Sequence, residues 1–275
     1  MQEDNVQALN NWGLVICDLA NYYKGSEGDD HNNDNNDTRK QLYRLAMSRF
    51  RQALRRSGLG SQDSGVDRKV LARCSYNMGS VMYQYCSLVN NNNDGSRSQN
   101  DGDGDGDDIR VAHAAQYVLL AYALNPSSEV FQKAVRSIRQ FLPLPFLRFS
   151  KLVYVYDETK ETDQVQQWRP KSLVLDGYHL KTVEVHSSEV TDMEISVQDV
   201  TSCSICVDPW IKSSGVGVKI RHRGSRHCVY LSSGAASQED LQGLQDAIIL
   251  LRVCSSSGLQ ALADVLHQAS YRNGQ

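Results

Sequence analysis

"RCSYNMGSVM", residues 73–82, repeats in outline an earlier stretch of the chain, "ALNNWGLVI", residues 8–16. Both stretches have the apolar periodicity of a helix. Both contain an asparagine, a large apolar residue and a glycine in direct succession. Because a glycine carries no side chain, a neighbouring helix can approach it closely. The two stretches therefore predict two helices, each packed tightly against a partner helix at Gly13 or Gly79.

Each predicted helix is followed, after a polar insertion, by a second helix with small and large residues at fixed offsets. In "LYRLAMSRFRQAL" the spacing is A-x3-F-x2-A, formed by Ala46, Phe50 and Ala53. In "HAAQYVLLAYALNP" the corresponding residues are Ala114, Val118 and Ala121, and the stretch ends at Pro126. This order resembles the tetratricopeptide repeat. A further helix, "SSEVFQKAVRSIRQFL", is interpreted as a capping helix or as the first helix of a third repeat. Residues 1–142 are therefore predicted to be tetratricopeptide-type α-α repeats.

The polar insertions are predicted to be disordered loops near residues 24–40 and 90–108. Both are rich in Asn, Asp, Gly and Ser, which cannot bury enough apolar area to offset the entropy of ordering. The alternating "DGDGDGD" of the second loop suggests a calcium-binding EF-hand as an alternative. That motif requires a Glu at its twelfth position, where this chain has Ala112. A solvated acidic loop is therefore the favoured interpretation.

A change of sequence pattern marks a second domain. Pro143 and Pro145 stop helical continuation, and residues 143–150 form an apolar, proline-containing connector that we expect to be wedged between the two domains at Phe146. From residue 151 onward, β-branched and aromatic runs separated by turn residues predict about six or seven antiparallel strands, followed by an amphipathic helix. This order resembles a pleckstrin-homology-like domain. The predicted fold class is thus α+β, with residues 151–275 forming an antiparallel β barrel with a C-terminal helix.

The composition excludes several functional classes. A net charge of −3 gives no basic excess for nucleic-acid binding. The chain has no apolar run of membrane-spanning length, and its N-terminus does not look like a secretory signal. Seven cysteines without framework spacing fit reduced thiols in the cytoplasm. Because no catalytic motif, phosphate-binding loop or paired metal-ligand spacing is present, we expect no enzyme activity, no cofactor and no metal.

The β domain offers two further candidate sites. Cys203 and Cys206 form one CxxC, with His227 and Cys228 as conceivable zinc partners. Residues three apart on a strand point to opposite faces, so ordinary strand cysteines are favoured over zinc or redox chemistry. The stretch "KIRHRGSRHCVY" could instead form an anionic-lipid patch, although a charge-protected strand edge is favoured. The patch residues are Lys219, Arg221, Arg223 and Arg226.

The helical part supplies the main candidate binding site. If the repeats pack as tetratricopeptide repeats do, their first helices line a groove for an extended peptide. Tyr76 and Tyr83 could alternatively pack the core. The predicted groove residues are Asn10, Leu14, Arg73, Tyr76, Ser80, Tyr83 and Lys133.

The combination of helical repeats and β domain resembles a plant tetratricopeptide-repeat family named for hypersensitivity to latrunculin B. The resemblance implies a cytoplasmic adaptor, peripheral on trans-Golgi and early-endosome membranes, whose protein partners are trafficking machinery and actin. The leading hypothesis is therefore a non-catalytic adaptor. The alternative is a peripheral membrane protein that binds anionic lipid through its β domain.

Overall fold

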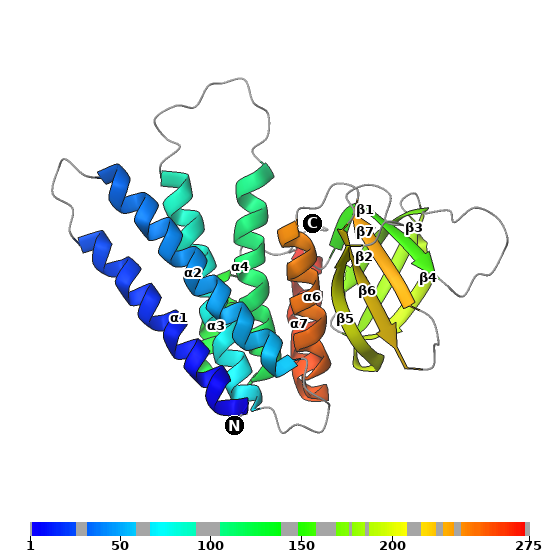
Figure 1. Cartoon of the computed structure of the whole chain (residues 1–275). Coiled ribbons are helices and arrows are strands. Elements are labelled where there is room, and N and C mark those ends of the chain that lie inside the picture. Colours follow the sequence, from blue (N-terminus) through cyan, green and yellow to red (C-terminus); the bar gives the residue numbers. More distant parts are fainter. Residues whose placement is uncertain are drawn as a thin grey trace, which may run out of the picture. The chain divides into compact units, whose positions relative to one another are not determined.

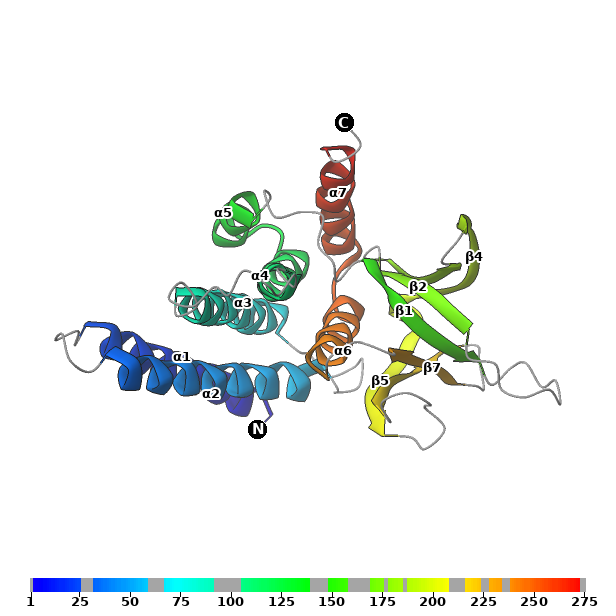
Figure 2. The same ribbon diagram turned by 90° about the horizontal axis from the view of Figure 1, so that it is seen from above.

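The computed structural model describes most of the chain, in eleven segments: residues 2–25, 32–58, 67–91, 105–138, 148–157, 169–175, 178–184, 187–207, 216–223, 228–233 and 238–272. The chain divides into two compact units, Met1–Phe141 and Leu142–Gln275. Figure 1 labels the strands and most of the helices, and Figure 2 also labels α5 (Glu129–Ile138).

The first unit is a row of antiparallel helices. It contains α1 (Gln2–Gly25), α2 (Asn32–Gly58), α3 (Arg68–Asn91), α4 (Asp105–Leu124) and α5 (Glu129–Ile138). Each helix packs against the next one along the chain. Figure 2 shows α1 and α2 together at one end of the row, with α3, α4 and α5 following in order. The two glycine-containing stretches lie in α1 and α3, the first helices of two successive hairpins.

Close helix contacts at the two glycines organise the core of this unit, as their lack of a side chain predicts. A Cβ atom added to Gly13 would lie 2.6 Å from Cε1 of Phe50, and one added to Gly79 would lie 2.7 Å from the carbonyl oxygen of Ala114. Both distances are too short for real Cβ contacts. The helical unit also contains fully buried side chains, which include Tyr43, Ala46, Phe50, Ala53, Met78, Tyr117 and Leu119.

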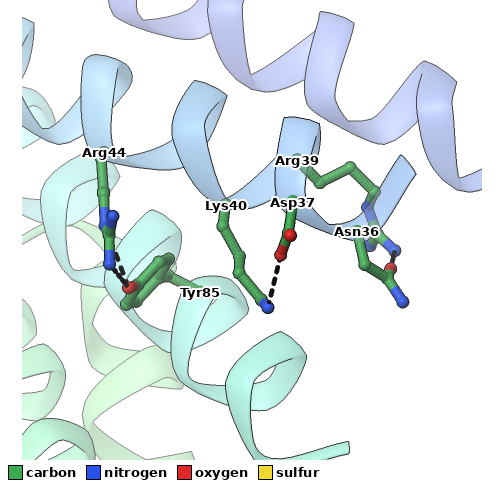
Figure 3. A network of polar contacts seen from close by, with 6 residues as sticks. All are labelled: Asn36, Asp37, Arg39, Lys40, Arg44 and Tyr85. Atoms are coloured by element: carbon green, nitrogen blue, oxygen red, sulfur yellow. Dashed lines mark hydrogen bonds and ion pairs between the residues drawn. The ribbon is translucent and has the colours of Figure 1, made fainter. Parts of the chain in front are cut away.

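Helix α2 begins inside the segment that the composition assigns to a polar insertion. Asn32 to Lys40 are helical. Two contacts at i,i+3 spacing support this end of the helix, an ion pair of 2.9 Å between Lys40 Nζ and Asp37 Oδ1 and a hydrogen bond of 3.2 Å from Arg39 Nη1 to Asn36 Oδ1 (Figure 3). Such pairs each stabilise a helix by about 0.2–0.5 kcal/mol. Residues 24–25, 90–91 and 105–108 of the predicted insertions are helical as well, in α1, α3 and α4, and residues 26–31 and 92–104 lie outside the described residues.

The second unit contains one antiparallel sheet and two helices. Its strands are β1 (Arg148–Asp157), β2 (Arg169–Leu175), β3 (His179–Glu184), β4 (Ser187–Ser196), β5 (Val200–Val207), β6 (Val216–His222) and β7 (Cys228–Ser233). The sheet order is β4-β3-β2-β1-β7-β6-β5, so β4 and β5 are the two edges. Of the predicted connector, residues 143–147, including Phe146, lie outside the described part, and 148–150 begin β1.

The predicted β barrel is wrong. A barrel needs its edge strands to pair with each other, but the described strands form an open order in which β4 and β5 are not neighbours. The short helix η3 (Val197–Asp199) joins these two strands and turns the chain between them. Helices dominate the residues whose side chains the structure describes. The strand residues among them belong to two small two-stranded pieces, from β3 with β4 and from β5 with β6.

Two helices follow the sheet. Helix α6 (Gln238–Arg252) packs on β5, β6 and η3, and α7 (Ser256–Arg272) comes directly after it. The sequence predicts one apolar stripe on α6, yet every residue from 243 to 251 is buried, including Gln245 and Asp246. Gln245 Nε2 donates a hydrogen bond of 3.0 Å to the carbonyl oxygen of Cys203 on β5. Among the described helices, none has both the length and the apolar composition needed to cross a membrane.

Candidate protein-binding surface

Two side-chain hydrogen bonds tie α1 to α3. Arg73 Nη2 donates to Gln7 Oε1 at 3.3 Å, and Asn77 Nδ2 donates to Asn10 Oδ1 at 3.0 Å. Asn10 is buried, so its amide belongs to the contact between the helices. Arg73 is exposed. The polar residues predicted to line a groove therefore hold the two first helices side by side.

Helix α3 presents four of the predicted groove residues on one face. Arg73, Tyr76, Ser80 and Tyr83 are spaced by three, four and three residues, which places them along a single helical stripe. Arg73 and Tyr83 are exposed, whereas Tyr76 and Ser80 are half-buried. Leu14 is exposed on α1. We call these five residues, with Asn10, the α1–α3 surface.

The two tyrosines have different roles. The ring of Tyr76 lies 5.4 Å from the ring of buried Phe131 on α5, measured between centroids, so Tyr76 packs partly into the helical row. Tyr83 exposes about half of its surface. The core-packing alternative thus applies in part to Tyr76, while Tyr83 is available to a binding partner.

Lys133 is not joined to the α1–α3 surface by any described contact. It lies on α5 two residues after Phe131, so its side chain leaves the helix roughly 200° around from the ring that contacts Tyr76. Sequence reasoning missed Gln7 and Asn77, which bond the predicted residues. An Asn in the sequence Asn-large apolar-Gly was the available signal for Asn77.

The basic residues of β6 are placed differently from one another. Lys219 is half-buried and Arg221 exposed, on the opposite face of the strand from buried Ile220. Arg223 lies after the end of β6, where its backbone N–H donates a hydrogen bond of 2.8 Å to the carbonyl oxygen of Asp199. Arg226 lies outside the described residues. Burial lowers the pKa of nearby Arg252, and the charge of Arg223 lowers it further.

The CxxC of β5 has one buried cysteine. Burial, together with the neighbouring charge of Asp246, raises the pKa of Cys203 well above its ordinary value. Thiols with such a raised pKa are poor nucleophiles. Cys206 also lies on β5, but its side chain is outside the described part. Within the residues that the structure describes, no group of three or more His, Cys, Asp or Glu could hold a metal ion.

Two cysteines of the helical row are protected in the same way. Burial raises the pKa of Cys17 and of Cys74 to about 12. Because the unfolded thiols ionise near their ordinary pKa of 9.0, the unfolded chain releases these protons first as the pH rises. Both thiols therefore contribute stability that is fully present below about pH 9 and is lost progressively above it.

No family model, curated protein or solved structure matches this chain.

Proposed function

We propose that the chain is a non-catalytic adaptor whose α1–α3 surface binds an extended segment of a partner protein. One observation carries this proposal: two hydrogen-bonded helices present a cation, an aromatic ring and an aliphatic side chain to solvent, from Arg73, Tyr83 and Leu14. Because the helices are held together before binding, little further ordering is needed to form the site. Tyr and Arg are also among the residues that dominate binding energy at protein interfaces.

The chemistry of the surface indicates the kind of segment that fits. The Arg73 guanidinium can hold a carboxylate through charge-assisted hydrogen bonds. Tyr83 offers a flat ring for an apolar or proline side chain, and Leu14 extends the apolar contact onto α1. An extended peptide with an acidic residue next to an apolar one matches these groups.

The test is peptide selection on the immobilised full chain from a displayed library, followed by affinity measurement. We expect selected peptides to bind the variant with Arg73→Glu and Tyr83→Ala at least tenfold more weakly than the wild type. The matched control changes an exposed arginine and an exposed apolar residue elsewhere in the helical row, Arg56→Glu with Val130→Ala, and should bind normally. Equal affinity for all three proteins, or no enriched peptide, would contradict the proposal.

The resemblance to plant trafficking adaptors extends the proposal to partners on trans-Golgi and early-endosome membranes and to actin. Because the sheet is open, the predicted barrel no longer supports that resemblance, and only the helical hairpins do. The same variants apply here. Filamentous actin should co-sediment the wild-type chain and the control but not the Arg73→Glu, Tyr83→Ala variant, and absence of the wild type from the pellet would remove actin from the proposal.

A second candidate function is binding to anionic lipid. It is favoured by the exposure of Arg221 and Arg223 close together at the end of β6. Basic residues near a membrane surface each contribute about 1 kcal/mol of attraction to anionic lipid, and salt screens this attraction. We expect flotation of the full chain with phosphatidylserine vesicles at low salt, and loss of flotation in the Arg221→Glu, Arg223→Glu variant. Vesicle binding that depends neither on the salt concentration nor on these substitutions would rule this candidate out.

A further inference from the structure

Helix α1 carries an exposed apolar stripe that the adaptor function does not use. Its residues are Trp12, Val15, Leu19 and Tyr22, which expose 52%, 64%, 45% and 75% of their surface. Their spacing of three, four and three residues places them along one side of the helix, in the pattern of a helix–helix seam. Large apolar side chains exposed in such a row mark an interaction surface rather than scattered surface residues.

This stripe lies on the side of α1 that faces away from α3. Gln7 and Asn10, which bond α3, leave the helix on the other side. In Figure 2, α3, α4 and α5 all follow on one side of the layer formed by α1 and α2. The stripe therefore belongs to the outer face of the first hairpin, where the helical row ends.

Helix α2 adds two residues to this outer face. The guanidinium of Arg49 stacks over the Trp12 ring, 4.1 Å from its centroid, and its Nη1 donates a hydrogen bond of 3.1 Å to Gln52 Oε1. Leu45, one helical turn before Arg49, exposes 42% of its surface. We call the six residues Trp12, Val15, Leu19, Tyr22, Leu45 and Arg49 the end face.

The size of the end face matches the needs of a stable dimer. Terminal helices of repeat arrays normally have polar outer faces. Here the five apolar side chains together expose on the order of 500 Å², near the upper end of the largest patch found on a typical monomer. Two copies would bury on the order of 1,000 Å², the area that a specific interface requires.

We propose that the end face forms a homodimer in which α1 of one copy packs antiparallel against α1 of the other. A two-fold interface must be complementary to itself, and the stripe has this property. When the pairing is centred between Val15 and Leu19, Trp12 meets Tyr22 of the partner subunit, and Val15 meets Leu19 of the partner subunit. Every position of the stripe then faces an apolar residue.

The charges and polar groups also fit this arrangement. Asn11 and Asp18 are exposed beside the stripe, on the edge away from α2, where they form a polar rim. Arg49 lies on the other edge, next to the aromatic pair of Trp12 and Tyr22 of the partner subunit, a favourable environment for a guanidinium. Neither charge lies in the apolar centre. The α1–α3 surface faces the other way and stays open to its own partner.

Sedimentation equilibrium of the full chain tests the dimer. We expect the wild type to pass from monomer to dimer as its concentration rises through the micromolar range, and the Val15→Glu, Leu19→Glu variant to associate at least tenfold more weakly. Both residues are exposed, so the variant monomer should keep its thermal midpoint. The control Val130→Glu changes an equally exposed valine on α5 and should associate like the wild type. A wild type that stays monomeric at about 100 µM, or association that the double substitution leaves intact, overturns the proposal.

Disulfide trapping tests the antiparallel orientation. Residues 12 and 22 are about 15 Å apart along one helix. Under oxidation, Tyr22→Cys alone should therefore give no more crosslinked dimer than the wild type, whereas Trp12→Cys combined with Tyr22→Cys should give a covalent dimer. Efficient crosslinking by Tyr22→Cys alone would show a parallel pair and overturn the antiparallel arrangement.

Discussion

Replacing Gly79 by valine is expected to separate α3 from α4 and to destabilise the helical row by about 3 kcal/mol. The new Cβ would lie 2.7 Å from the carbonyl oxygen of Ala114, 3.1 Å from Cγ2 of Val118 and 3.3 Å from Cβ of Tyr117. The nearest of these atoms belongs to the backbone of α4 and cannot rotate away. The steric cost must exceed the gain in helix propensity, about 0.5 kcal/mol, that a β-branched residue such as valine offers over glycine.

Separation of the two helices would also break a buried hydrogen bond. Ser75 Oγ, one turn before Gly79, donates a hydrogen bond of 2.8 Å to the carbonyl oxygen of Tyr117. If α4 moves outward, both groups lose a partner in a buried environment, at a cost of about 1–3 kcal/mol. Gly79→Val should therefore cost more than a steric contact alone.

Amide hydrogen exchange measured by mass spectrometry resolves the effect to α3 and α4. A loss of about 3 kcal/mol corresponds to exchange about a hundredfold faster at the most protected amides. Ser87→Val is the control, because it puts the same side chain at an exposed position of the same helix. If both variants exchange at the same rate, the close approach at Gly79 does not limit the stability of the hairpin.

The helical hairpins were predictable because the residues that decide them are of unusual types at fixed spacings. A glycine inside an apolar helical pattern indicates a close neighbour, and the structure supplies that neighbour at both positions. The start of α2 was missed because composition describes a segment as a whole. The contacts Lys40–Asp37 and Arg39–Asn36 depend on particular residues at helical spacing within an otherwise polar segment (Figure 3).

The barrel could not be distinguished from an open sheet in the sequence. Alternating apolar residues show that one face of a strand is buried, but they do not show whether the first and last strands of a sheet pair. In this chain α6 packs on β5 and β6, where Cys203 and Ile220 are buried, so a helix covers this face of the open sheet. The placement of Lys133 was uncertain for another reason. Whether Lys133 faces the predicted groove depends on the orientation of α5, which no repeat pattern specifies.

The end face was readable in principle. The spacing of Trp12, Val15, Leu19 and Tyr22 is visible in the sequence, but α1 also carries a second apolar side, at Leu9, Gly13, Ile16 and Ala20. A helix that is apolar on two sides is normally buried on both. Only the structure shows which of the two sides packs against α2 and which is exposed.

The second large effect is expected at Phe50, the neighbour of Gly13. Phe50→Ala should destabilise the helical row by about 3–5 kcal/mol, because it removes a fully buried ring and leaves a cavity between α1 and α2. Phe50→Leu should cost less, since leucine retains much of the buried volume. The free energy of unfolding is measured by hydrogen exchange of α1 and α2 peptides, with exposed Leu14→Ala as the control.

Combining Phe50→Leu with Gly13→Ala separates a side-chain contact from a backbone contact. The three atoms nearest to a Cβ at position 13 are all ring atoms of Phe50, at 2.6, 2.7 and 3.0 Å, and leucine lacks the far part of that ring. We therefore expect Gly13→Ala to be destabilising beside phenylalanine and nearly neutral beside leucine, with a coupling of at least about 1 kcal/mol in the double-mutant cycle. At Gly79 no such rescue is expected from Val118→Ala, because the nearest obstacle is the carbonyl oxygen of Ala114. Additive effects at Gly13, or rescue at Gly79, would show that the helices adjust their separation freely and that the glycines do not set it.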